Sequence, residues 1–206
     1  MGAKLYSTTF CPYAWCTRIV LNEKGVPFEV FEVDLKSKQP EFLAVSPAAK
    51  SPVFVDGETN IPESMVINEY IEEKYPLPNL LGENPQERAI VRSAVIDHCW
   101  YRSQPLARLT SLLMRSEEDR DDGRMHKQLR QWYQYLDELD AHFQDEEWRL
   151  LGRYTIADIS IYTTVAVSCG FGMPIGERPA LQSWLAGMAT RETVKRSAPQ
   201  AIPAIV

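Results

Sequence analysis

The cysteine at position 11 stands in a setting suited to thiol chemistry. Residues 10–18 read FCPYAWCTR and lie between a predicted first strand and a predicted first helix. Pro12 suits the first turn of a helix, which places Cys11 at the helix N-terminus. Unpaired backbone N–H groups and the positive end of the helix dipole lower a thiol pKa there and favour the nucleophilic thiolate. A small buried hydrophobic side chain is the alternative, but the position favours a functional cysteine.

A second cysteine, Cys16, follows five residues later. It lies roughly 140° further round a helix of 3.6 residues per turn, so the two thiols do not share a face. A thioredoxin-like dithiol needs Cys-x-x-Cys, and Ala14 stands where the second cysteine would be. We therefore expect Cys16 to serve packing, and any second thiol in a redox reaction must come from outside the chain.

Two short stretches further along could bind a ligand. In Lys50-Ser51-Pro52-Val53, a proline that opens a short strand suggests a cis peptide, whose exposed backbone can pair with a ligand backbone. Near Glu63, Ser64 begins a predicted helix, where it can cap the helix and neighbouring N–H groups can bind an anion. Glu63 could pair with a ligand amine. Glu-Ser before a helix is a weak signal by itself, because Ser64 could be no more than a cap.

The first part of the chain, residues 1–75, is predicted to form a small α/β unit. Its expected order is strand, helix, strand, helix, two strands and helix, with strand-like runs at 4–7, 28–33 and 52–55. Asp56-Gly57 is a turn signal, so the last two strands should form a hairpin.

After a linker, the rest of the chain is predicted to be helical. Residues 76–85 hold three prolines and a glycine, which is typical of a linker. Residues 86–206 should form an all-helical domain, in which apolar residues at intervals of three and four mark an amphipathic helix at 129–143. The other expectations are a helix over 86–115 with a kink at Pro105, a solvated loop at 117–123, and helices at 156–167, 178–188 and 190–197, the first of them buried.

Composition and charge exclude several classes of protein. The chain has 206 residues, 45% of them hydrophobic, and a net charge of −6. An acidic chain without a basic cluster is a poor candidate for non-specific nucleic-acid binding, and its apolar runs are too short to span a membrane. Four irregularly spaced cysteines and the lack of a secretory signal lead us to expect a reducing, cytoplasmic setting. The histidines lack metal-ligand spacing, so we expect no metal.

Together these motifs resemble the glutathione transferase superfamily over nearly the whole chain. The resemblance implies a thioredoxin-like N-terminal domain, a linker and an all-helical C-terminal domain. Cys-Pro-Tyr-Ala at 11–14, followed by Thr17-Arg18, is similar to the cysteine-type members, especially the omega class and dehydroascorbate reductases. In that group the position of Cys11 is the catalytic cysteine. Residues 155–158 resemble the family's N-capping box, with Asp in place of Glu or Gln.

The resemblance also implies a set of ligand contacts. Glutathione would be held at its cysteinyl backbone by Ser51 and Pro52, at its γ-glutamyl end by Glu63 and Ser64, and near its glycyl carboxylate by Lys38. A weaker set could line the pocket of the acceptor substrate, with interhelix packing as the alternative: Tyr13, Trp100, Tyr101 and Arg108. Cys16, Ser51 and Lys50 depart from the usual omega pattern, which leaves the class open but not the fold.

Three functions compete at this stage. The first is a glutathione-dependent thiol transferase or reductase that acts through a mixed disulfide between Cys11 and glutathione, with a small electrophilic or disulfide substrate. The second is glutathione-dependent cleavage or dehalogenation of an aromatic small molecule. The third is a non-catalytic regulatory or binding protein, although the chain retains both the Cys-Pro-Tyr-Ala and Glu-Ser motifs. Homodimerisation is the family habit, and residues 63–75 and 86–105 would contribute to the contact.

Overall fold

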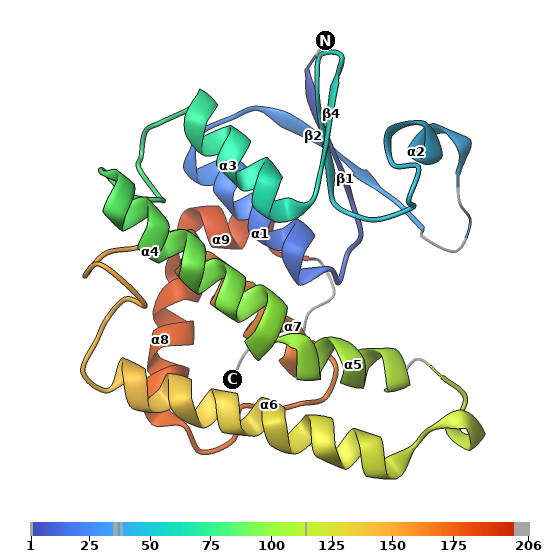
Figure 1. Cartoon of the computed structure of the whole chain (residues 1–206), viewed down its shortest axis with the longest axis vertical. Coiled ribbons are helices and arrows are strands. Elements are labelled where there is room, and N and C mark those ends of the chain that lie inside the picture. The colour runs from blue at the N-terminus through green and yellow to red at the C-terminus, as the bar shows by residue number, and fades with distance from the viewer. Residues whose placement is uncertain (1, 35–36, 38, 114, 200–206) are drawn as a thin grey trace.

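A four-stranded mixed sheet forms the centre of the N-terminal part (Figure 1). The computed structural model describes residues 2–34, 37, 39–113 and 115–199, so Lys38 lies outside the described residues, as does the tail from 200 onward. The strands are β1 (Ala3–Ser7), β2 (Phe28–Glu32), β3 (Val53–Asp56) and β4 (Thr59–Pro62), in the order β2-β1-β3-β4. β1 pairs in parallel with β2 and antiparallel with β3, and the predicted β3–β4 hairpin is confirmed.

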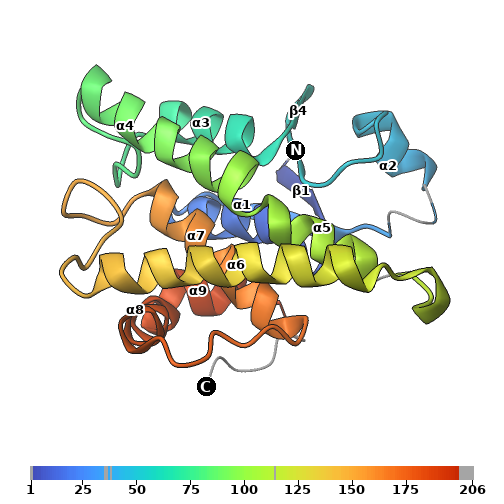
Figure 2. The same cartoon turned by 60° about the horizontal axis from the view of Figure 1, so that its bottom comes forward.

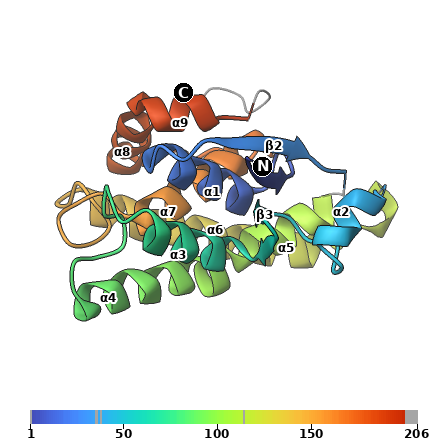
Figure 3. The same cartoon turned by 90° about the horizontal axis from the view of Figure 1, so that it is seen from above.

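Three helices complete this unit: α1 (Pro12–Glu23), α2 (Pro40–Val45) and α3 (Ser64–Lys74). The predicted order of strands and helices is therefore confirmed. In Figure 3, α1 lies between α3 and α9, and it also packs on α7. Because neighbours surround it, residues 14–21 of α1 are all buried, and Trp15 meets Tyr162 of α7 at a ring-centroid distance of 5.5 Å.

The second part consists of helices. They are α4 (Pro85–Ile96), a π-helical turn (Asp97–Arg102), α5 (Gln104–Leu113), a 3-10 turn (Glu117–Asp119), α6 (Asp122–Phe143), α7 (Ile156–Gly170), α8 (Pro179–Thr190) and α9 (Glu192–Ser197). Figure 2 shows the long α6 beside α5 and α8. None of the described helices combines the length and the apolar character that crossing a bilayer requires.

Two local predictions need correction. The helix predicted over residues 86–115 is interrupted by the π-helical turn at 97–102 and not at Pro105. Pro105 sits in the first turn of α5, where its missing N–H removes no hydrogen bond. The acidic segment 117–123 is not wholly a loop. Asp121 accepts a hydrogen bond from the Arg124 N–H at 2.9 Å and so caps α6, which begins at Asp122.

Helix α7 is the buried axis of the second part, as predicted. Its capping box is confirmed: the Thr155 hydroxyl accepts from the Ala157 N–H, and the Asp158 carboxylate accepts from the Thr155 N–H at 2.8 Å. Asp158 also accepts from the Arg149 N–H at 2.7 Å. Burial raises the pKa of Asp158, while these hydrogen bonds lower it.

The two parts share one apolar core. It runs from Leu5 and Ile19 to Trp132 and Ile159, and burial of this surface is the main favourable contribution to folding. α3 ends at Lys74 and α4 begins at Pro85, with neither helix nor strand between them. The division into domains at 75 and 86 remains a proposal, because the core crosses it.

A buried ion pair between α1 and α3 binds the segment that follows α3, through the Pro78 carbonyl and the Leu80 N–H. Lys24 and Glu72 lie 2.5 Å apart, with their side chains 0% and 1% exposed. Removing one partner of a buried pair costs about 3–5 kcal/mol, whereas apolar replacement of both is often tolerated. We expect Glu72→Gln to lower the free energy of unfolding in urea by about 3 kcal/mol, and Lys24→Met with Glu72→Leu to recover much of that loss.

Glu58→Gln, at an exposed position of the hairpin, is the matched control and should change little. A Glu72→Gln protein as stable as the wild type would contradict this account of the pair.

Candidate functional site

Cys11 is the N-cap residue of α1, as its sequence context predicts. Its N–H donates to the Thr8 carbonyl at 3.1 Å, which closes the short loop between β1 and α1. The thiol is half-buried, and its Sγ lies 3.9 Å from the carbonyl oxygen of Ser51, which it faces as a donor. The nucleophile candidate and the Ser51–Pro52 segment therefore meet, although they stand 40 residues apart.

The expected lowering of the Cys11 pKa is wrong for this geometry. Burial raises the pKa of the thiol, and this is the largest effect. The backbone N–H groups of Ala14 and Tyr13, the Thr8 hydroxyl and the charge of Arg18 all lower that pKa, as a helix N-terminus should, but together they do not outweigh the burial. The sequence pattern therefore predicted the donors and missed the desolvation.

The peptide bond between Ser51 and Pro52 is cis, as predicted. It directly precedes β3, whose Val53 pairs with Tyr6 of β1 and so fixes the segment against the central strand. The Ser51 hydroxyl is buried and has no hydrogen-bond partner within the described structure. A buried hydroxyl without a partner is unusual, and it leaves a donor and acceptor available beside Cys11.

Glu63 and Ser64 begin α3 in an unusual backbone conformation. Glu63 has φ +66° and ψ 115°, a region that costs a non-glycine residue about 1–3 kcal/mol and that clusters at ligand-binding positions. Glu63, not Ser64, occupies the cap position, and its side chain makes no capping hydrogen bond. The alternative that Ser64 is simply a helix cap is therefore wrong. The first N–H groups of α3 have no side-chain cap, which makes them available to an anion.

These residues surround a cavity of about 610 Å³, a size typical of small-molecule sites. Its lining comprises Tyr13, Ser51, Pro52, Glu63, Ser64, Met65, Val66, Cys99, Trp100 and Gln104. A hollow of about 280 Å³ adjoins it, since Tyr13, Ser51, Pro52 and Glu63 line both. The structure thus brings together four of the predicted glutathione contacts: Ser51, Pro52, Glu63 and Ser64. Cys11 is not part of the lining, but its sulfur contacts the carbonyl of Ser51.

The predicted acceptor residues are only partly assembled. Tyr13 and Trp100 line the cavity, whereas Tyr101 and Arg108 are exposed and not part of its lining. Trp100 is 61% exposed, so interhelix packing does not explain it. Sequence reasoning missed Met65, Val66, Cys99 and Gln104. The available signal was that each lies within four residues of a predicted site residue, Ser64 or Trp100.

No metal site accompanies the cavity. Within residues 2–34, 37, 39–113 and 115–199, no three His, Cys, Asp or Glu side chains gather closely enough to hold a metal ion. His98 is buried rather than at the surface, and its ring contacts the Tyr135 hydroxyl at 2.8 Å and the Thr164 hydroxyl at 3.0 Å. Burial lowers the pKa of His98 to about 4, so it is a neutral structural group.

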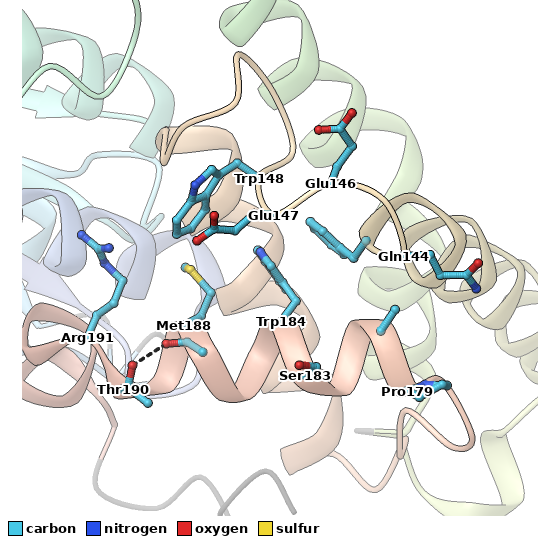
Figure 4. A pocket seen from close by; sticks show the side chains of 13 residues that line it. Gln144, Glu146, Glu147, Trp148, Pro179, Ser183, Trp184, Met188, Thr190 and Arg191 are labelled. Atoms are coloured by element: carbon cyan, nitrogen blue, oxygen red, sulfur yellow. Dashed lines mark hydrogen bonds between the residues drawn. The ribbon is translucent and has the colours of Figure 1, made fainter.

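A larger hollow of about 850 Å³ lies elsewhere, between the end of α6, the loop that follows it and α8 (Figure 4). Trp148 and Trp184 project into it from the loop and from α8. It contains none of the predicted site residues and no cysteine. The smaller cavity beside Cys11 is therefore the candidate active site.

Comparisons with known proteins by sequence lead to one family. The family model for the glutathione S-transferase N-terminal domain matches residues 5–80. Glutathione S-transferase 1 of Dianthus caryophyllus is 31% identical over 194 residues, which cover 87% of this chain and 84% of that protein. Glutathione S-transferase omega-1 of Sus scrofa is 31% identical over 137 residues, which cover 66% of this chain but only 55% of that protein.

The comparison with solved structures shows the fold. The crystal structure of a glutathione S-transferase from Methylobacillus flagellatus, with GSH bound, matches with a TM-score of 0.85 and 23% identity, covering 96% of this chain and all of that one. At 23% identity the structural likeness shows only the fold, so the assignment to a family rests on the relatives found by sequence. The chain belongs to the glutathione S-transferase family.

Proposed function

We propose that the chain is a glutathione-dependent thiol transferase or reductase of the cysteine type, with Cys11 as nucleophile and glutathione as cosubstrate. The observation that carries this proposal is the position of the Cys11 sulfur, at the N-terminus of α1 and 3.9 Å from the carbonyl oxygen of Ser51, a residue that lines the cavity together with Glu63 and Ser64. Family membership supports glutathione as the thiol. The similarity of the chain to glutathione S-transferase omega-1 of Sus scrofa supports the cysteine type.

The proposed reaction is a pair of thiol–disulfide exchanges. The Cys11 thiolate attacks the glutathione sulfur of a glutathionyl mixed disulfide, and the substrate leaves as a thiolate that takes up a proton. The thiolate of a second glutathione then attacks the glutathione sulfur of the Cys11 adduct, which releases glutathione disulfide and regenerates Cys11. Ala14 in place of a second cysteine fits this route, because no internal thiol is placed to resolve the adduct.

Each predicted contact has a role in this proposal. Ser51 and Pro52 present backbone to the cysteinyl part of glutathione, and the Glu63 carboxylate pairs with the γ-glutamyl amine. The Ser64 hydroxyl and the N–H groups that begin α3 receive the γ-glutamyl carboxylate. Lys38 is proposed for the glycyl carboxylate from the sequence resemblance. Tyr13 and Trp100 border the space left for the acceptor substrate.

The first test is the intact mass of the protein after incubation with glutathione disulfide. Wild type should gain one glutathione, about 305 Da, and Cys11→Ser should gain none. Because burial raises the pKa of Cys11, the thiolate fraction is small at neutral pH, and the adduct should form faster as the pH rises.

Cys169→Ser is the matched control, since Cys169 is also partly exposed but does not line the cavity. An adduct that persists in Cys11→Ser, or no adduct in wild type at any pH, would refute Cys11 as the nucleophile.

The second test concerns Glu63. A hydrogen bond to a charged group contributes about 1.5–3 kcal/mol, so Glu63→Ala should weaken glutathione binding about 10- to 100-fold in calorimetric titration. Glu58→Ala, an exposed glutamate on the same hairpin, should leave the Kd unchanged. Equal affinity of wild type and Glu63→Ala would remove Glu63 from the glutathione site.

We also propose that the protein forms a homodimer through α3 and α4. These helices expose Val66, Ile90 and Ile96, and the Arg92–Glu69 ion pair joins them at 2.5 Å. Light scattering after size-exclusion chromatography should give twice the chain mass of 23.5 kDa. Ile90→Glu should shift the protein towards the monomer, since a buried charge opposes an apolar contact. A wild-type mass of one chain would disprove the dimer.

A further inference from the structure

Arg18 is a buried cation whose hydrogen bonds are incomplete. The residue is 6% exposed, and its Nη1 donates to the Ser7 hydroxyl at 2.7 Å. Its Nε and Nη2 are buried and have no hydrogen-bond partner within the described structure. Buried charges are normally paired and fully hydrogen-bonded, so a guanidinium with two unsatisfied nitrogens calls for an explanation.

Glu32 is the acidic partner of Arg18 among the described residues, and it compensates the charge only in part. Glu32 lies 3.5 Å from Nη1 of Arg18, and the Glu32 side chain is 51% exposed, so water screens its charge. The other carboxylate oxygen of Glu32 accepts a hydrogen bond from the Thr9 hydroxyl at 3.0 Å. Arg18 therefore keeps an excess of positive charge on its buried side.

The position of Arg18 relates this charge to the loop that presents Cys11. Arg18 lies seven residues after Cys11, which is two helical turns and nearly the same face of α1. Helical side chains point back towards the N-terminus, so the long arginine extends towards the turn that carries Cys11. Its contacts, Ser7 and Glu32, end β1 and β2, and Thr9 belongs to the β1–α1 loop.

We propose that Arg18 is a positioning residue for Cys11: it holds the 7–11 loop through Ser7 and the Glu32–Thr9 bond, and its uncompensated charge favours the Cys11 thiolate. This inference rests on the proposed function of Cys11 as nucleophile. It adds a role for a residue that does not line the cavity and does not touch the proposed ligand.

The electrostatic environment agrees in direction. Burial raises the pKa of Cys11, and the charge of Arg18 is among the effects that oppose this increase. Burial lowers the pKa of Arg18, while the charges of Glu32 and of the Cys11 thiolate raise it. Tyr13 and Cys16 also interact with Cys11, but burial raises the pKa of both, to about 11 for Cys16, so both are uncharged at neutral pH.

The test uses the full chain and measures alkylation of Cys11 by iodoacetamide from pH 6 to 10, read by mass spectrometry of the peptide that contains Cys11. Arg18→Met removes the charge and keeps the unbranched stem of the side chain as far as the position of Nε. It should raise the pKa of Cys11 and so lower the alkylation rate at pH 7 severalfold, because the charge of Arg18 is one of the smaller effects that lower this pKa. Arg18→Lys keeps the charge and should recover most of that rate.

Glu32→Gln gives the opposite prediction. It removes the negative charge, while the amide oxygen can still accept from Thr9. The pKa of Cys11 should fall and the rate at pH 7 should rise, about twofold because the carboxylate is half-exposed. This variant changes an exposed side chain, so it keeps the test decisive even if Arg18→Met does not fold.

The control variant is Arg153→Met, which removes an ion pair with Glu87 remote from the β1–α1 loop. It should leave the pH profile of Cys11 unchanged. If Arg18→Met and Glu32→Gln also keep the wild-type profile and alter only the melting temperature, Arg18 is structural and the proposal is wrong. A glutathione adduct that fails to form while the alkylation profile still shifts would reject the proposed function and leave the role of Arg18 in place.

Discussion

The buried ion pair between Lys24 and Glu72 is the constraint on which the site depends. Lys24 also donates to the Pro78 carbonyl at 2.5 Å, and Glu72 accepts from the Leu80 N–H at 3.2 Å. The Leu80 carbonyl in turn accepts from the Ile156 N–H at 2.9 Å, at the start of α7. One chain of polar contacts therefore fixes the end of α1, the end of α3 and the beginning of α7, in surroundings where an unpaired group is costly.

The opposite ends of the same helices form the candidate site. Cys11 lies at the N-terminus of α1, and Glu63 stands at the N-terminus of α3. The ion pair near the C-terminal ends and the packing of α1 on α3 together restrict the movement of one N-terminus relative to the other. The middle of α1 packs against its neighbours, and Cys16 has this packing role. Its sulfur contacts the Ser160 hydroxyl and the Asn68 amide, both at 3.5 Å, and it does not line the cavity beside Cys11.

The features that the sequence predicted correctly are those encoded by short local signals. Asp56-Gly57 predicts the hairpin, Pro12 the start of α1, and Thr155 with Asp158 the capping box, because each residue type satisfies a local backbone requirement. The interruption of the helix after Ile96 carries no such local signal. The cavity wall was harder still, since only the tertiary fold brings Cys99 and Gln104 to the same cavity as residues of α3.

The state of the Cys11 thiol shows why local signals were insufficient there. The N–H groups of Tyr13 and Ala14 follow from the helix, but the desolvation that outweighs them comes from the surrounding fold. Burial penalises a charge concentrated on one sulfur more than a charge spread over several atoms. In thiol–disulfide exchange the negative charge is shared among the attacking, central and leaving sulfurs. A half-buried sulfur with fixed donors and the nearby charge of Arg18 is therefore better matched to the transition state of the proposed exchange than to a resting thiolate.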